Sequence, residues 1–562
     1  MRRLRAGTAI IIGITMALLL AACSSSGNGG GPSSATKSGG SVTFALDENL
    51  AGFNVNTSAA SEFVLQEITN LVWPQVFIVN QDLQPVLNTQ LMDSATQTST
   101  SPQTIVYKIN PAAKWADGTP ISADDFIYNW QAQSGNSQYT DVGGKPFDDA
   151  STTGYNQIKS VTGSNGGKTV TVVFSTPFAD WKSLFGNIVP AHIAKVVGWN
   201  TGFNNYQKVL SGSWYEISSY QANQFVVLKR NPHYWSTPGK LSTITFQIFN
   251  GDQQAVPAMQ NNEVQVINPL EVSLSVVQAA DALTNVTKSN EPGLEFQHFD
   301  FNQSDPYLAQ LPIRQAIAYG TDRKAIIART IGEFTKNVKP LDNHMLVPEQ
   351  QGYENNGAQY DNVNDAKAKS LLESAGMKMG SDGYYQPSSG PQAGKDLTFT
   401  INSTTGNDLR SSIEQLWQAQ MKAIGIKILI ANQDANTLFG STLPNGTYQI
   451  ALFAWVSTPF LSGNQSIYCS YTNTNNCGQN WNHYANATTD KYMAEGAQAS
   501  TSAQEIQDYN QADKQLWADM VTLPLFQDPI FFVWSNKYGG IVPNGSSDGL
   551  TWNANLWGLK AS

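Results

Sequence analysis

The feature that most constrains the fold is the long stretch from residue 41 to residue 562, which contains no internal repeat and no low-complexity linker. A single hydrophobic core stops growing at about 250 to 300 residues, so a chain of this length divides into at least two lobes. Because no linker separates them, we expect lobes that are closely joined rather than domains on a flexible string.

The first 22 residues have the layout of an export signal. A basic start, Met1 to Arg5, precedes the apolar run "TAIIIGITMALLLAA", which is shorter than the roughly 20 residues of a membrane-spanning helix. Small residues before Cys23 resemble a bacterial lipoprotein box, which implies a lipid on Cys23. An ordinary secretory signal with a chance cysteine is the alternative. Residues 23–40 are rich in Gly and Ser and predict a flexible linker.

Charge and cysteine content exclude some partners. The chain has a formal charge of −10, and removal of residues 1–22 takes away three arginines and no acid, which leaves −13. Nucleic acid is therefore not an expected partner. Cys469 and Cys477 would remain, and in an exported chain such a pair most simply forms a local disulfide. A metal site there is the rival, but only His483 lies nearby as a further ligand.

Hydrophobic periodicity predicts a mixture of strands and helices. Alternating segments predict strands in "GSVTFAL", "TIVYKIN", "GKTVTVVFSTP" and "NQFVVLKRNPHYW". Helical spacing appears in "SEFVLQEITNLVW", "PIRQAIAYG", "DNVNDAKAKSLLESAG" and "SSIEQLWQAQMKAIG". The last of these runs into the strand "IKILIAN", and "YQIALFAW" predicts a buried strand, an order typical of an α/β lobe.

The stretch "KWADGTPISADDFIYNW", residues 114–130, combines three acids with several aromatic residues. Asp117 and Gly118 supply a turn. Ser122 is placed as a helix N-cap, with Asp125 as its capping-box partner and Asp124 near the positive end of the helix dipole. These carboxylates are therefore predicted to be structural rather than catalytic.

Five segments, in this order and at these separations, resemble the peptide/nickel class of extracytoplasmic solute-binding proteins of ABC importers. They are "YKINPAAKWADGTPISADDFIYNW", "LKRNPHYW", "PIRQAIAYGTDRKAII", "AKSLLESAG" and "AIGIKILI". The resemblance covers essentially residues 41 to 560. It implies an α/β, two-lobed periplasmic-binding-protein-like (type II) fold, with paired hinge strands and a ligand enclosed between lobes that close.

The resemblance also implies how the chain is divided. Lobe I would comprise residues 41–78, 208–298 and 527–562, an inserted subdomain residues 79–207, and lobe II residues 299–526. The hinges would fall near "FQHFDFN" and "LPLFQDPIF".

Family members that bind peptides hold the peptide mainly through main-chain groups, which gives loose sequence specificity. A strand end in lobe II usually carries an aromatic residue and, three residues later, an aspartate for the peptide's α-ammonium. The corresponding run here is "FAWVSTP", so Thr458 stands where the aspartate is expected, and a hydroxyl cannot replace that charge-assisted bond. The ligand-binding residues implied by the resemblance are Thr57, Ser58, Ala59, Tyr139, Asn268, Ala454, Trp455, Val456, Ser457 and Thr458. Trp455 as a core residue is the alternative.

The sequence motifs do not favour an enzyme, and they leave more than one ligand class open. The five histidines show no HExxH motif and no helical ligand pair, and no G-x-S-x-G motif occurs, so a secreted hydrolase is not favoured. The resemblance implies a peptide, an ABC permease as partner, a lipid anchor at the outer face of the cell membrane, a monomer, and no cofactor or metal. Oligosaccharide, nickel or haem remain alternative ligands, and a signalling lipoprotein would share the same sequence features.

Overall fold

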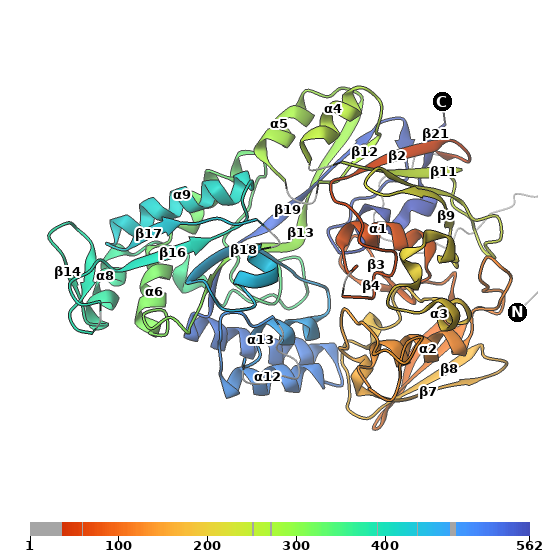
Figure 1. Cartoon of the computed structure of the whole chain (residues 1–562), viewed down its shortest axis with the longest axis horizontal. Helices are drawn as coiled ribbons and strands as arrows, with labels where there is room; N and C mark the ends of the chain where they lie inside the picture. Colours follow the sequence, from red (N-terminus) through yellow and green to blue (C-terminus); the bar gives the residue numbers. More distant parts are fainter. Residues whose placement is uncertain are drawn as a thin grey trace, which may run out of the picture.

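The computed structural model describes residues 36–561 apart from 59, 250–251, 270–271, 391, 435–436 and 472–478. The predicted export signal, the lipidation site Cys23 and most of the linker lie outside these residues, as does Cys477, so the lipid anchor and the disulfide to Cys469 stay predictions. Figure 1 shows two bodies side by side, connected by long strands that cross from one to the other. The mixed α/β, two-lobed fold expected from the sequence is confirmed.

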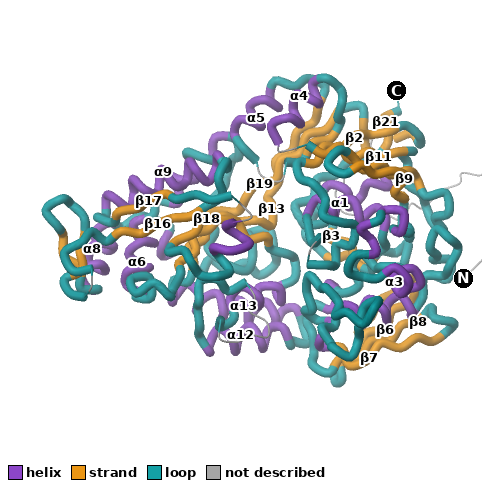
Figure 2. Tube along the Cα trace, in the orientation of Figure 1, coloured by secondary structure: helices purple, strands orange, loops and turns teal. Residues whose placement is uncertain are grey.

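A ten-stranded sheet runs through both bodies, as the continuous strands in Figure 2 show. One half, in the body we name lobe I, is formed by β9 (Tyr215–Gln221), β10 (Phe225–Arg230), β11 (Thr243–Ile248), β2 (Ser41–Leu46) and β12 (Val266–Ile267). The other half, in lobe II, is formed by β18 (Ile450–Val456), β16 (Thr398–Asn402) and β17 (Lys427–Ile430). Between them lie β13 (Val286–Phe301) and β19 (Thr522–Ser535), which belong to both halves.

The two long strands break their ladder where they pass between the lobes. β13 and β19 are antiparallel, and the pairing passes from Pro292↔Pro529 to Phe296↔Gln527 with a shift of register. Proline cannot donate to a sheet ladder, so facing prolines weaken the pairing at this point. The segment "LPLFQDPIF" contains the break on β19. On β13 the first break lies immediately before "FQHFDFN", and a second shift of register, between Gln297 and His298, lies within that segment.

Smaller sheets complete the β-structure. A four-stranded antiparallel sheet, in the inserted subdomain, contains β5 (Met92–Thr100), β6 (Gln103–Ile109), β8 (Thr169–Phe174) and β7 (Ile158–Ser164). The others contain β1 (Thr36–Lys37), β21 (Gly558–Lys560) and β20 (Tyr538–Gly539); β3 (Phe77–Val79) and β4 (Pro85–Leu87); and β14 (Met377–Met379) and β15 (Tyr385–Pro387).

The helices lie largely where periodicity predicts them. Those of lobe I and the inserted subdomain are α1 (Phe63–Val72), α2 (Ala123–Gln133), α3 (Ala191–Val197), α4 (Ala255–Gln260) and α5 (Leu274–Asp281). Those of lobe II are α6 (Leu311–Gly320), α7 (Arg323–Ala328), α8 (Asp365–Ser374), α9 (Asp408–Ala423), α11 (Gln465–Tyr468), α12 (Ala487–Ala497) and α13 (Ser502–Asp519).

The capping box predicted at the start of α2 is confirmed, and its acid also joins two helices. Asp125 accepts hydrogen bonds from the backbone N–H of Ser122 at 3.0 Å and from that of Ala191, at the start of α3, at 2.9 Å. Asp117 lies 2.9 Å from His192. The acids of this stretch therefore order the inserted subdomain, as the sequence predicted.

The two lobes have separate large hydrophobic cores. One contains buried residues between 42 and 248 together with residues 532–557, so lobe I and the inserted subdomain share a core. The second contains buried residues between 299 and 526. We propose the division of the chain expected from the sequence, with lobe I at 41–78, 208–298 and 527–562, the inserted subdomain at 79–207 and lobe II at 299–526.

The described residues contain neither a membrane-spanning helix nor a group of metal-binding side chains. Among residues 36–561, with the gaps given above, no helix is long and apolar enough to cross a membrane. Within that same part of the chain, no group of three His, Cys, Asp or Glu side chains could hold a metal ion.

Candidate ligand-binding site

A cleft of about 340 Å³ lies between the lobes, and its walls come from segments far apart in the sequence. Lobe I and the inserted subdomain contribute most of its lining, and lobe II contributes the segment after β18. The lining residues are Val55, Asn56, Gln66, Gln75, Phe77, Val79, Gln133, Ala150, Ser151, Thr153, Tyr155, Lys182, Ser183, Leu184, Gly186, Asn187, Thr458, Phe460, Ser462, Gly463, Ser547 and Asp548.

Uncharged polar groups dominate this lining. Side-chain amides and hydroxyls make up about half of the residues, and Lys182 and Asp548 are the only charged side chains among the described residues that line the cleft. Amides and hydroxyls can both donate and accept hydrogen bonds, so such a wall suits a ligand with many main-chain-like polar groups.

Asp548 is a buried carboxylate at the lobe I wall. Its Oδ2 accepts a hydrogen bond of 2.7 Å from the backbone N–H of Val79, and the side-chain amides of Gln75 and Gln66, which donate to Asn70, also favour the charged form of the carboxyl. Burial raises the pKa of Asp548 to about 6 in spite of these bonds, which favour the charged form. Neutral groups therefore orient the carboxylate of Asp548, but they offset only part of the cost of burying its negative charge.

The cleft is closed at one edge by contacts between the inserted subdomain and lobe II. Asp180 accepts a hydrogen bond of 2.8 Å from the backbone N–H of Ser462, in the short 3₁₀ helix Leu461–Asn464. Beside it, the N–H of Ala179 donates to the carbonyl of Ala497 at 2.9 Å, at the end of α12. The lobes are thus in contact across the cleft, as in a closed binding protein.

Two carboxyl groups meet at this contact. The buried side chain of Glu505, in α13, lies close enough to that of Asp180 for the two carboxyl groups to shift each other's pKa. Burial, followed by the charge of Asp180, raises the pKa of Glu505 to about 9, and burial also raises the pKa of Asp180. The pair therefore retains a proton at neutral pH while the lobes are in contact.

A smaller cavity adjoins the cleft beside the hinge strands. Ser547 lines both spaces, and the smaller one also contains Asn268 and the exposed side chain of Val456, two residues that the sequence predicted for the site. Asn268 donates a hydrogen bond of 3.2 Å to Glu67, a buried acid whose pKa is raised by burial to about 8.

Thr458 lines the cleft, but its hydroxyl is engaged within its own turn. The hydroxyl donates to the carbonyl of Phe460 at 2.9 Å and accepts from the N–H of Phe460 at 3.2 Å. Ser457 is buried, and its N–H donates to the carbonyl of Leu294 at 2.9 Å. These residues shape the lobe II wall mainly through the backbone.

Trp455 packs into the interior of lobe II and is not among the residues that line the cleft. Its ring lies 5.1 Å from that of Phe453, 5.2 Å from that of Trp481 and 5.8 Å from that of His298, and only 8% of its surface is exposed. Alternation along β18 directs Trp455 to the same side as Phe453. Ala454, on the other side, is half-buried. These contacts favour the alternative interpretation of Trp455, that it is a core residue.

The remaining predicted residues do not gather at the cleft. Thr57 is buried and its hydroxyl donates to the carbonyl of Asn54 at 2.9 Å, while Ser58 is exposed and its hydroxyl bonds to Asp148. Tyr139 lines a separate cavity of the inserted subdomain. Ala59 lies outside the described residues. Binding roles for these positions stay predictions.

Sequence reasoning missed the residues that supply most of the polar lining. Gln66 lies within α1 and Gln75 shortly after it, Asn187 and Lys182 belong to the segment after β8, and Asp548 lies in the stretch "PNGSSDGL". The Gly, Ser and Asn content of that stretch predicts a loop but gives no sign that the loop returns to the cleft.

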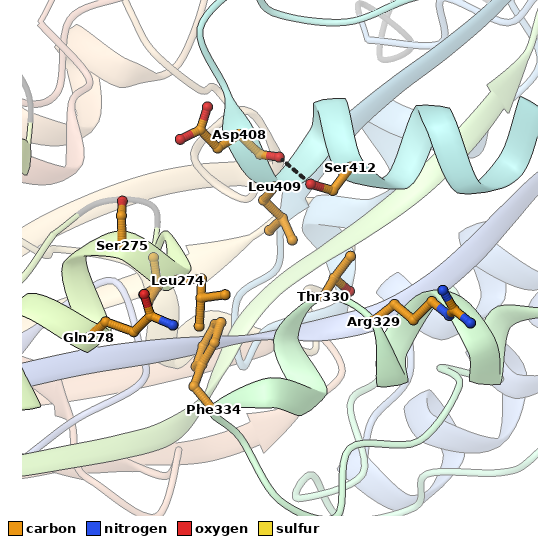
Figure 3. Close-up of a pocket in the computed structure, with 10 residues that line it drawn as sticks. Leu274, Ser275, Gln278, Arg329, Thr330, Phe334, Asp408, Leu409 and Ser412 are labelled. Carbon is orange, nitrogen blue, oxygen red and sulfur yellow. Dashed lines mark hydrogen bonds between the residues drawn. The ribbon is translucent and has the colours of Figure 1, made fainter.

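A second cavity of about 290 Å³ lies between α5 of lobe I and α9 of lobe II. In Figure 3 the side chains of Leu274, Gln278 and Phe334 gather on one side of it, and Leu409 faces them from the start of α9. Figure 1 places α5 and α9 on one side of the hinge strands, and α12, α13 and the inserted subdomain on the other. This cavity, which we call the groove between α5 and α9, is therefore separate from the cleft.

Comparison with known proteins identifies relatives of the whole chain. Residues 86–477 match the model of bacterial extracellular solute-binding proteins, family 5 (middle). The oligopeptide-binding protein OppA of Mycobacterium tuberculosis is 28% identical over 500 residues, which cover 88% of this chain and 80% of OppA. The matched family and this relative are named as binding proteins, not as enzymes.

Solved structures share the fold over nearly the full length. The periplasmic EDTA-binding protein EppA superposes with a TM-score of 0.86 at 25% identity, covering 94% of this chain and 98% of EppA. The oligopeptide-binding protein AppA of Bacillus subtilis, solved with a nonapeptide, has a TM-score of 0.77 at 20% identity and covers 94% of this chain and 100% of AppA. At that identity AppA supports the fold alone.

Proposed function

Since the chain belongs to family 5 of the bacterial extracellular solute-binding proteins, we propose that it captures peptides outside the cell membrane and delivers them to the permease of an ABC importer. In this role the protein performs no chemistry. It binds the solute between its lobes, closes around it and presents it to the membrane complex.

The observation that carries this proposal is the closed interlobe cleft with a lining of amides and hydroxyls. Closure removes water from the ligand, so each polar group left without a partner costs about 1 to 3 kcal/mol. A wall of groups that donate and accept can satisfy a peptide backbone whatever its side chains are. The oligopeptide-binding relatives are consistent with this class of ligand.

A non-peptide solute of similar size is the second candidate, because EppA, which superposes closely, is an EDTA-binding protein. The hydroxyl of Thr458 also cannot serve as the acid that peptide binders usually carry at that position. Oligosaccharides, nickel complexes and haem fall in the same group of alternatives.

We further propose that a lipid on Cys23 holds the protein at the outer face of the cell membrane, that the permease is its only protein partner, and that it acts as a monomer. The flexible linker expected over residues 23–40 is shortened by β1, which pairs with β21, so the Gly- and Ser-rich residues 24–35 would serve as a tether of roughly 17 to 21 Å root-mean-square span.

Native mass spectrometry of the protein as purified tests the ligand class. A ladder of peptide masses on the folded protein is the expected result. Hexose multiples, or a single mass that matches a metal complex or haem, would replace the peptide proposal with one of the alternatives.

A further inference from the structure

Among the described residues that line the cleft, Asp548 is the one buried acid, and none is a buried base. Asp548 is 5% exposed, whereas Lys182, the other charged residue of the lining, is exposed and its ammonium lies 5.9 Å from the ring centre of Trp181. The backbone N–H of Val79 donates to the Asp548 carboxylate, and the side-chain amides of Gln75 and Gln66, which donate to Asn70, act on it as neutral neighbours. All three are neutral, so the negative charge of Asp548 has no counter-ion among these contacts.

The main chain around Asp548 fixes where this charge points. The N–H of Asp548 donates to the hydroxyl of Ser546 at 3.2 Å, and its carbonyl accepts from the amide of Asn70 at 3.1 Å. With backbone and carboxylate both held, the acid presents a constant geometry to the cleft. A carboxylate offers about four acceptor positions and the N–H of Val79 occupies one of them at 2.7 Å, so an acceptor position remains for a ligand.

The described residues of lobe II that line the cleft include no acid. Thr458 uses its hydroxyl both to donate and to accept within its own turn, and the other lobe II residues of the lining are Phe460, Ser462 and Gly463. A cationic group of a ligand would therefore find its only buried partner on the lobe I side of the cleft.

We propose that Asp548 binds the free amino group of a peptide in the interlobe cleft. This inference rests on the proposed function and adds which ligands are selected: peptides with an unblocked N-terminus, anchored on lobe I rather than on lobe II. An ammonium supplies a charge-assisted hydrogen bond to the remaining acceptor position, and it compensates the buried charge that neutral amides leave incompletely stabilised. An anionic chelate would be repelled by this acid, and a sugar hydroxyl could donate to it but would not compensate its charge.

The test is a double-mutant cycle between the protein and its ligand. The tetrapeptide that binds most tightly in a library of unblocked tetrapeptides is titrated calorimetrically into the wild type and into Asp548→Asn. The N-acetylated form of the same peptide is titrated into both proteins. Asp93→Asn, which removes an exposed acid outside the cleft lining, is the matched control for charge. Thermal unfolding of each variant verifies that it is folded.

We expect acetylation to weaken binding to the wild type and to Asp93→Asn by about 10-fold to 100-fold, and binding to Asp548→Asn by less than about threefold. If Asp548 only supported the loop, the substitution would weaken both peptides equally and the effect of acetylation would persist. That result, or tight binding of the acetylated peptide to the wild type, overturns the inference and leaves peptide binding intact. If no unblocked peptide binds the wild type, the proposed function fails, and this inference fails with it.

Discussion

The carboxyl pair at the mouth of the cleft makes closure sensitive to pH. In the closed arrangement burial, followed by the charge of Asp180, raises the pKa of Glu505 to about 9, and burial raises the pKa of Asp180 as well. When the lobes separate, both carboxyls return to water, where their pKa values lie near 4. Closing at neutral pH therefore takes up about one proton.

The direction of the pH effect on closure follows from the raised pKa of Glu505. A group that binds its proton more tightly in the closed state stabilises that state at low pH, and the stabilisation is lost as pH rises toward about 9. One proton changes the free energy of closing by about 1.4 kcal/mol per pH unit, so raising the pH from 6 to 8 weakens closing by up to about 2.7 kcal/mol, or about 100-fold. The other groups that face the pair are neutral: the N–H of Ser462 and the hydroxyl of Tyr509.

Calorimetry can count this proton directly. Peptide is titrated into the wild type and into Glu505→Gln at pH 7.5, in two buffers that differ in ionisation enthalpy. The amide of Gln can donate to Asp180 without a titrating proton, so the wild type should take up about one proton more per bound ligand than Glu505→Gln. Glu495→Gln, an exposed residue of α12, should behave as the wild type. A difference below about 0.3 proton between wild type and Glu505→Gln would refute the reasoning.

Three further substitutions test separate parts of the account. Asp125→Ala removes the acceptor of two helix-terminal N–H groups and should lower the free energy of unfolding by about 3 kcal/mol in chemical denaturation, whereas exposed Asp124→Ala should cost less than about 1 kcal/mol. Trp455→Ala should cost about 3 to 5 kcal/mol in the same assay because the ring is packed in lobe II, and a loss below about 1 kcal/mol would contradict that placement. Cys23→Ser should move the protein from the membrane fraction to the soluble fraction, and persistent labelling with a radioactive fatty acid would contradict the lipid anchor.

The sequence predicted the features that depend on local patterns. Periodicity located the main helices and strands, and the capping box at Ser122 is present as expected. Each of these depends on residues within a few positions of one another, where spacing and hydrogen-bonding capacity determine the outcome.

The cleft could not be predicted in the same way, because its walls are assembled by tertiary contacts. Asp548 faces the cleft because its carboxylate binds the N–H of Val79, more than 400 residues earlier in the chain. The resemblance to peptide binders directed attention to Trp455 and Thr458. The buried ring of Trp455 and the local hydrogen bonds of Thr458 explain why these two side chains contribute little to the polar lining.

Hydrogen exchange measured by mass spectrometry, with and without a saturating peptide, tests the central claim most directly. If a peptide is enclosed between the lobes, amide protection should increase on both walls, in residues 182–187 and 545–548 on one side and in residues 458–463 on the other. Binding that protects only one lobe, or only the groove of Figure 3 between α5 and α9, would contradict it.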